Sequence, residues 1–124
     1  MVNSIGLDLV EIARIEQDLK RCGERFATRI LGTEEMEIYA GRRDKTLFLA
    51  GRFAAKEAVI KALGFYLKER PPFSDIQIIN DPTGQPQLKL PEHVLRTLPG
   101  HRCLLSITHE KHYAAAMALF EEKK

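Results

Sequence analysis

Cysteine is scarce in this sequence, which limits the covalent and metal chemistry that the chain can build. The two cysteines, Cys22 and Cys103, lie far apart and form no Cys-x-x-Cys pair. A thiol redox motif and a zinc knuckle both need closely spaced cysteines, so neither is available from this chain alone. We therefore expect two buried, reduced thiols, as in a protein of the cytoplasm.

Long apolar runs and an excess of one charge sign are also missing. The longest apolar run covers residues 113–120, and the N-terminus lacks a basic segment followed by an apolar one. A signal peptide or a membrane span needs such features, so we predict neither. Lysine and arginine total 19 against 17 aspartate and glutamate, which gives a net charge of +2. Proteins that bind nucleic acid through bulk positive charge show a clear basic excess, so we expect no nucleic-acid and no membrane partner.

The rest of the composition is that of an ordinary globular protein. The chain has 124 residues, of which 44% are hydrophobic and 29% are charged. A chain of this length typically forms one domain and can bury an apolar core without disulfide or metal support. We therefore expect a single domain over residues 1–124.

The apolar periodicity predicts helices in the first half of the chain and strands mostly in the second. We expect a mostly buried strand over residues 2–10 and helices over 12–22, 24–31, 33–41 and 44–63, with Thr33 and Asp44 as N-caps. Strands are expected over 76–79, 87–90, 102–108 and 113–120, the last buried on both faces, and a short helix over 91–98 ends at Pro99-Gly100. This order favours an α+β fold, with an antiparallel sheet packed against the long helix 44–63.

The long helix is rich in apolar residues. Of the 18 residues from 46 to 63, 12 are apolar and four are charged. On a helix these apolar positions reach nearly all the way round, so we expect a largely buried helix that carries some of its charges inward. The charged residues are Arg52, Lys56, Glu57 and Lys61.

Asp8 and Glu57 are the carboxylates with the most apolar neighbours in the sequence. Burying a carboxylate is costly unless cations or hydrogen bonds compensate it, and the two could face one cavity if the first strand packs on the long helix. Two carboxylates with few other ligands suit magnesium, which completes its octahedron with water and substrate phosphate oxygens. Arg52, Lys56 and Lys61 would then bind that substrate. The alternative is an ordinary surface ion pair between Glu57 and Lys61, with Arg52 and Lys56 extended toward solvent.

Further basic residues that could bind a ligand or a partner lie near the two ends of the sequence. His109 would lie at a strand end beside a hairpin loop, where a histidine is either solvated or in contact with a ligand. Arg14, Arg21, Arg25 and Arg29 could share one face if the first two helices continue in register. Such a basic stripe would suit an acidic partner protein, whereas the plainer interpretation is a solvated face diluted by nearby acids.

Two longer motifs carry a resemblance to a known family. Residues 5–12 read Ile-Gly-Leu-Asp-Leu-Val-Glu-Ile, and residues 48–58 read Phe-Leu-Ala-Gly-Arg-Phe-Ala-Ala-Lys-Glu-Ala. Together with the turn at 81–86 and Ser-Ile-Thr-His at 106–109, the sequence resembles the holo-[acyl-carrier-protein] synthases, the small group of 4'-phosphopantetheinyl transferases. The matches cover most of the chain in the expected order, and they imply the 4'-phosphopantetheinyl transferase fold.

The resemblance implies an enzyme of fatty acid biosynthesis that moves the 4'-phosphopantetheine arm of coenzyme A onto a serine of apo acyl carrier protein, releasing adenosine 3',5'-bisphosphate. It implies Asp8 and Glu57 as Mg2+ ligands. Lys61 and the adjoining turn at Gly64 match coenzyme A phosphate contacts, and His109 matches a position near the nucleotide. To these contacts we add Arg52 because of its charge.

The resemblance also implies partners and an assembly. The carrier protein would bind at Arg14 and the basic helix after it, which includes Arg21 and Arg25. Members of the family form homotrimers with active sites between neighbouring subunits. Relatives usually continue with a Gly-Thr-Gly-like loop, of which only Gly64 is present here.

The expected mechanism combines these residues. Glu57 would act as general base for the carrier serine, with Lys56 or Lys61 stabilising the leaving phosphate. An alternative from another class is a non-catalytic module that binds a nucleotide or an acidic protein through the same cations.

Overall fold

The computed structural model of the protein describes residues 1–98 and 100–122. The first half forms strand β1 (Val2–Glu11) and helices α1 (Ile12–Cys22), α2 (Glu24–Ile30), α3 (Thr33–Ala40) and α4 (Lys45–Leu63). The second half holds the short 3-10 helix η1 (Phe73–Asp75), strands β2 (Gln77–Asn80) and β3 (Pro86–Lys89), helix α5 (Glu92–Leu95), and strands β4 (His101–His109) and β5 (Tyr113–Glu122). This order confirms the predicted α+β fold. In the described part of the chain, no helix has the length and apolarity that crossing a membrane requires.

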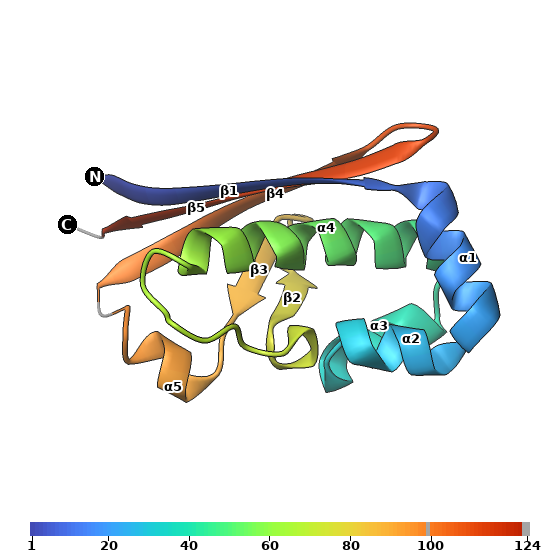
Figure 1. Ribbon diagram of the computed structural model, residues 1–124, viewed down its shortest axis with the longest axis horizontal. Coiled ribbons are helices and arrows are strands. Elements are labelled where there is room, and N and C mark those ends of the chain that lie inside the picture. The colour runs from blue at the N-terminus through green and yellow to red at the C-terminus, as the bar shows by residue number, and fades with distance from the viewer. Residues whose placement is uncertain (99, 123–124) are drawn as a thin grey trace.

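Helix α4 runs through the middle of the molecule between two layers (Figure 1). On one side the strands pair antiparallel in the order β1-β5-β4. On the other side lie the β2–β3 hairpin, α5 and the helices α1 to α3. Leu49, Ala54 and Val59 of α4 are completely buried, and the charged Arg52 and Lys56 are buried with them. The predicted burial of the long helix is thus confirmed.

The three-stranded sheet turns one face toward α4 and leaves the other face open. Val10 of β1 is buried, whereas Ile5, Leu7 and Leu9 are 59%, 65% and 63% exposed. Met117 of β5 pairs with Leu7 and is exposed on the same side. Successive side chains of a strand point to opposite faces, so only half of each strand reaches α4. The expectations of a mostly buried first strand and of a last strand buried on both faces are therefore wrong for the single chain.

Strand β1 crosses α4 at Gly6. A Cβ added at Gly6 would lie 1.8 Å from the carbonyl oxygen of Ala58 and 3.0 Å from the backbone nitrogen of Ala62. A glycine is needed for this close approach because any side chain would collide with the helix backbone. Asp8 lies two residues further along the same face of the strand and is therefore directed at α4.

The capping of two helices differs from the expectation. Gly32, rather than Thr33, is the N-cap of α3, and its N–H donates to Oε1 of Glu35 at 3.0 Å. Asp44 is the N-cap of α4, as predicted, but within the described chain its side chain makes no capping hydrogen bond. Its two carboxylate oxygens instead accept hydrogen bonds from the Arg42 guanidinium, each at 2.7 Å. An ion pair with a neighbouring arginine thus takes the place of the expected side-chain capping bond.

Helix α5 and the cysteines also differ from the expectation. The helix ends at Leu95, and the chain continues to Leu98 in turns. Of the predicted break at Pro99-Gly100, Pro99 lies outside the described residues. Cys22 and Cys103 are free thiols, as expected, but both are partly rather than fully buried.

Candidate functional site

Asp8 and Lys61 meet where β1 crosses α4. The Lys61 ammonium donates to Oδ1 of Asp8 at 3.1 Å and to the carbonyl oxygen of Leu7 at 3.0 Å. The Asp8 side chain is 16% exposed and that of Lys61 is 53% exposed. An ion pair so open to water contributes little stability, so the Lys61 ammonium can turn from Asp8 to an anionic ligand at low cost.

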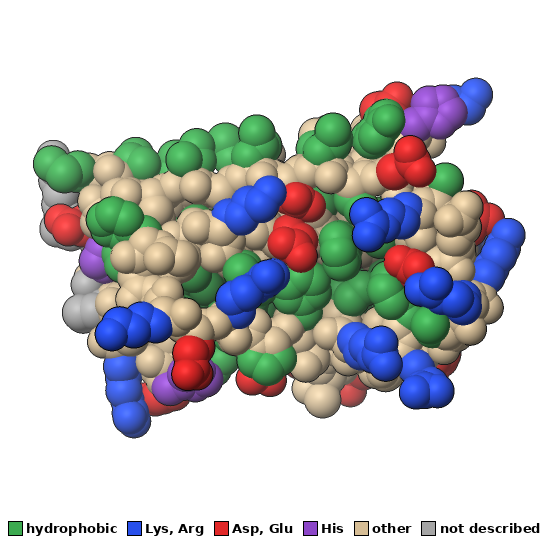
Figure 2. Space-filling model, in the orientation of Figure 1, with side chains coloured by type: hydrophobic (Ala, Val, Ile, Leu, Met, Phe, Trp, Pro, Cys, Tyr) green, Lys and Arg blue, Asp and Glu red, His purple; other side chains and the backbone are tan. Residues whose placement is uncertain are grey.

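Glu57 lies one helical turn before Lys61, on the same side of α4. Its Oε2 is 3.6 Å from the Arg70 guanidinium, and its side chain is 26% exposed. Lys61 and Glu57 are thus each paired with a residue of another segment, and the surface pair considered as an alternative is replaced by these contacts. We call Asp8, Glu57, Lys61 and Arg70 the carboxylate site. Figure 2 shows acidic side chains flanked by basic ones over the middle of α4.

A hollow of about 280 Å³ opens where α4 ends, beside the carboxylate site. Its lining includes Gly64, Lys68, Arg70 and Pro71. The predicted ligand contact at Gly64 therefore lies at the edge of the same hollow as Arg70, the partner of Glu57. Sequence reasoning missed Arg70, because nothing local indicates that the irregular segment after Gly64 folds back onto α4.

Arg52 and His109 lie together at the other end of α4. They line a cavity of about 140 Å³, which we call the arginine cavity; its lining also includes Arg42, Asp44, Phe48 and Asn80. Arg52 is 7% exposed, and its guanidinium carbon lies 4.6 Å from the centre of the Phe48 ring. The Arg42 guanidinium, hydrogen-bonded to Asp44, lowers the pKa of that carboxyl. Arg42 already donates two hydrogen bonds to Asp44, whereas Nε of Arg52 has no hydrogen-bond partner among the described residues, so Arg52 is the arginine of this cavity better able to take an anionic ligand.

The arginine cavity and the carboxylate site are separated along the helix. Arg52 precedes Glu57 by five residues and Lys61 by nine, which corresponds to about 7.5 Å and about 14 Å along the helix axis. At 3.6 residues per turn, Glu57 and Lys61 are also rotated by about 140° and about 180° around the axis from Arg52. Arg52 and His109 are therefore brought together with each other, but not with Asp8 and Glu57 of the same chain. A ligand that binds at both the arginine cavity and the carboxylate site would have to be long, or would have to lie between two chains.

The Lys56 side chain reaches neither the arginine cavity nor the carboxylate site. Its side chain is fully buried, and its ammonium donates to Oε1 of Glu35 at 2.5 Å and to the carbonyl oxygens of Ile30 at 2.5 Å and Phe73 at 3.0 Å. Burial lowers the pKa of Lys56, against the raising effect of Glu35. All three N–H groups are used, so the expected contact of Lys56 with a leaving phosphate does not fit this structure.

The predicted basic stripe lies on two helices that do not continue in register. Gly23 between them has φ 62° and ψ −145°, which ends α1 before α2 begins. Arg14, Arg21 and Arg25 are all exposed, and Arg21 binds Asp18 at 2.9 Å. Figure 2 shows basic side chains gathered over this end of the molecule, interrupted by a few acidic ones. The surface is basic, but its shape differs from a single straight stripe.

The donor set of the carboxylate site bears on which metal it could hold. Among residues 1–98 and 100–122, no group of three or more His, Cys, Asp or Glu side chains could hold a metal ion. The site offers the carboxylates of Asp8 and Glu57 as oxygen donors. Magnesium at phosphate-transfer sites is typically held by one or two carboxylates together with substrate oxygens and water, so this donor set fits magnesium.

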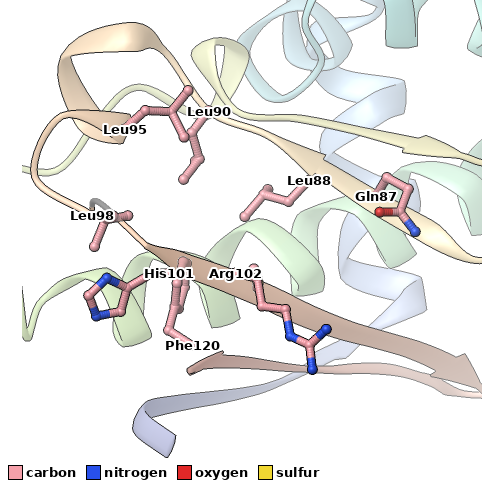
Figure 3. A pocket seen from close by; sticks show the side chains of 9 residues that line it. Gln87, Leu88, Leu90, Leu95, Leu98, His101, Arg102 and Phe120 are labelled. Atoms are coloured by element: carbon pink, nitrogen blue, oxygen red, sulfur yellow. The ribbon is translucent and has the colours of Figure 1, made fainter. Parts of the chain in front are cut away.

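A pocket of about 230 Å³ with a mixed polar and apolar lining lies elsewhere, between the β2–β3 hairpin, α5 and the sheet (Figure 3). Leu88, Leu90 and Phe120 are among its lining residues. Its polar residues are engaged with neighbours, since His101 contacts Asn3 at 3.0 Å and Arg102 donates to Glu121. Its described lining includes no residue predicted for the functional site, so we do not regard it as the reaction centre.

The chain is similar to known proteins over nearly its whole length. Residues 4–118 match the 4'-phosphopantetheinyl transferase superfamily. The chain is 43% identical over 120 residues to the holo-[acyl-carrier-protein] synthase of Aliivibrio fischeri, which covers 94% of this chain and 95% of that protein. It is similar to the crystal structure of the holo-[acyl-carrier-protein] synthase from Neisseria meningitidis, with a TM-score of 0.90 and 33% identity over 98% of this chain and 100% of that one. The Bacillus anthracis holo-(acyl-carrier-protein) synthase, in complex with CoA (3',5'-ADP), has a TM-score of 0.82 and 36% identity over 100% of this chain and 99% of that one.

Proposed function

The chain belongs to the 4'-phosphopantetheinyl transferase superfamily, and we propose that it transfers the 4'-phosphopantetheine group of coenzyme A to a serine of apo acyl carrier protein. The second product is adenosine 3',5'-bisphosphate. The observation that carries the proposal is the carboxylate site, in which Asp8 and Glu57 flank Lys61 on one side of α4. The name of the Aliivibrio fischeri relative and the CoA complex of the Bacillus anthracis relative support the same reaction.

Asp8 and Glu57 are the residues that would hold a magnesium ion in this reaction. The two carboxylates would supply oxygen donors to the ion, and water and substrate phosphate oxygens would supply the others. When bound, magnesium neutralises charge on the pyrophosphate and makes the phosphorus more open to attack. The support for this assignment is the oxygen-only donor set and the position of both side chains at the edge of the molecule rather than in its core.

The reaction forms a bond between the serine oxygen and the phosphorus attached to the pantetheine arm. It breaks the bond from that phosphorus to the oxygen of the leaving adenosine 3',5'-bisphosphate. Glu57 takes the serine proton, directly or through a water molecule. Lys61 stabilises the negative charge of the leaving group, because its ammonium is held at the site by Leu7 and Asp8 while its side chain remains 53% exposed.

We also propose that the complete active site forms between neighbouring subunits of a homotrimer. One chain keeps Arg52 and His109 apart from its own carboxylate site, so a neighbour's arginine cavity would have to face that site. The exposed apolar side chains Ile5, Leu7 and Leu9 on the outer face of the sheet support such an assembly, because a large apolar patch favours association. Figure 2 shows hydrophobic side chains along this edge of the molecule.

The carrier protein would dock on α1 and α2. Arg14, Arg21 and Arg25 are exposed there, and a basic surface raises the rate of encounter with an acidic partner. The product would serve fatty acid biosynthesis in the cytoplasm, which agrees with free thiols at both cysteines. Residues 1–124 would act as one transferase domain.

The release of adenosine 3',5'-bisphosphate tests this function. The chain is incubated with coenzyme A, apo acyl carrier protein and magnesium, and the bisphosphate is quantified by chromatography. We expect one bisphosphate for each carrier serine modified, and none when the carrier or the metal is left out. A non-catalytic binding module would leave coenzyme A intact in every mixture, and that result would overturn the proposal.

A further inference from the structure

Glu35 is a completely buried carboxylate that the proposed reaction does not use. Its Oε1 accepts hydrogen bonds from the Lys56 ammonium at 2.5 Å and from the N–H of Gly32 at 3.0 Å. Its Oε2 accepts one from the N–H of Ile78 at 3.1 Å, and Nε of Arg52 lies 3.6 Å from the same oxygen. One carboxylate therefore joins α3, α4 and β2.

The charges around Glu35 do not cancel. Two cations, Arg52 and Lys56, face one anion in a buried place. Lys56 has all three of its N–H groups on oxygen acceptors of the protein. Nε of Arg52, by contrast, has no hydrogen-bond partner among the described residues. The unbalanced positive charge thus resides on the guanidinium that lines the arginine cavity, where an anionic ligand would compensate it.

Glu35 also fixes a second wall of that cavity. The hydrogen bond from Ile78 ties β2 to the carboxylate, and Asn80, the last residue of β2, lines the cavity together with Arg52. Glu35 itself is absent from the described lining of the cavity. Its effect on a bound ligand would therefore pass through Arg52 and through the end of β2.

We propose that Glu35 is a positioning residue for the arginine cavity. It holds the Arg52 guanidinium and the Asn80 end of β2 in the arrangement that binds a phosphate group of the nucleotide half of coenzyme A. An arginine binds phosphate through a planar fork of N–H groups, so its orientation decides the strength of the contact. Without the Glu35 charge, the contact with the Phe48 ring would remain but would not fix that orientation. This inference rests on the proposed function for the identity of the ligand.

The first measurement is the affinity of the full chain for adenosine 3',5'-bisphosphate, by titration calorimetry. Glu35→Gln keeps the size of the side chain and removes its charge, and we expect the Kd to rise about tenfold, or about 1.4 kcal/mol. The KM for coenzyme A should rise by a similar factor while kcat changes little, because the carboxylate site is untouched. Glu34→Gln is the matched control: Glu34 is the preceding residue of α3, is exposed and pairs with Lys89, and its neutralisation should leave the Kd unchanged.

A double-mutant cycle separates positioning from general damage. In the Arg52→Gln background, Glu35→Gln should cause a much smaller further loss of affinity, because the part of its effect that passes through Arg52 is already lost and only the part that passes through β2 remains. An equal loss in both backgrounds, or an unchanged Kd in a folded Glu35→Gln variant, would overturn the proposal. If Glu35→Gln does not fold, Glu35→Asp keeps the charge on a shorter side chain. Its Kd should lie between those of the wild type and Arg52→Gln, and a Kd equal to that of the wild type would count against the proposal.

These measurements also distinguish a failure of the positioning role of Glu35 from a failure of the proposed transfer reaction. If the wild type binds the bisphosphate and the cycle shows coupling, but the carrier protein is never modified, the transfer reaction is wrong and the positioning role of Glu35 stands. If the carrier protein is modified and the cycle is additive, the transfer reaction stands and the positioning role is wrong.

Discussion

Gly6 lies so close to Ala58 that a methyl group on its α-carbon would come within 1.8 Å of the Ala58 carbonyl oxygen. This contact sets how near β1 approaches α4. It therefore also sets where Asp8, two residues further along the strand, stands relative to Lys61.

Replacing Gly6 by alanine should push β1 away from α4. We expect Gly6→Ala to destabilise the fold by about 1–3 kcal/mol, as overpacking of a filled contact does. The displaced Asp8 should also slow the transfer in the protein that remains folded. Chemical denaturation measures the first effect. Gly41→Ala is the control, because the nearest atom to an added Cβ there is 3.7 Å away. Equal stability of Gly6→Ala and the wild type would contradict the crossing described here.

A charge on the outer face of the sheet should break the proposed trimer. Leu7 is 65% exposed in the single chain, and an aspartate in its place would be buried without a partner in an apolar interface. We expect Leu7→Asp to run as a smaller species in light scattering and to lose transfer activity. Leu95→Asp, a similar change at an exposed leucine of α5, should keep the assembly of the wild type. Identical masses for wild type and Leu7→Asp would rule out this face as the interface.

Charge reversal on α1 should weaken the binding of the carrier protein and leave the binding of coenzyme A unchanged. For Arg14→Glu we expect the KM for apo acyl carrier protein to rise about tenfold, since like charges oppose encounter and docking. The affinity for coenzyme A, measured by calorimetry, should stay that of the wild type. Arg96→Glu alters an exposed arginine elsewhere, on the turn after α5, and should change neither quantity. An unchanged KM for Arg14→Glu would favour a merely solvated face.

The two thiols should differ in reactivity with pH. Burial raises the pKa of the Cys103 thiol from an ordinary 9.0 to about 12. Because the thiolate is the reactive form, iodoacetamide at pH 8 should modify Cys22 well before Cys103 in the folded protein, and both in denaturant. Peptide mass spectrometry reads the sites, and equal labelling of the two would contradict the burial of Cys103.

The same pKa shift makes a stability prediction with a definite sign. A thiol whose pKa is raised in the folded state contributes stability that is fully present below pH 9 and is lost as the pH rises toward about 12. Between those values the wild type should therefore lose more stability than Cys103→Ala.

Much of the fold could be predicted from local patterns. Apolar periodicity and the position of Gly23 were sufficient to predict the ranges of α1 and α4, because helix periodicity and helix ends are properties of short segments. The same reasoning was wrong about Ile5, Leu7 and Leu9. These apolar residues alternate with Gly6 and Asp8 and therefore read as the buried face of the strand, and the sequence does not reveal that the opposite face meets α4.

The site could be predicted in part for a similar reason. Asp8 and Glu57 were found because a charge within an apolar segment is costly and calls for an explanation. Glu35 was overlooked, since its partners Lys56 and Ile78 lie 21 and 43 residues away in the sequence. The assignment of Lys56 to the leaving phosphate failed through the same omission. Only the folded structure shows that Lys56 forms a buried ion pair with Glu35.

The measurement that tests the central claim most directly is the intact mass of apo acyl carrier protein after incubation with this chain, coenzyme A and magnesium. We expect the carrier to gain the mass of one phosphopantetheine group. Asp8→Asn and Glu57→Gln should each reduce the rate of that gain by at least about a hundredfold, because each removes a charge that the transition state needs. An unchanged carrier mass with the wild type, or an undiminished gain with both variants, would contradict the account.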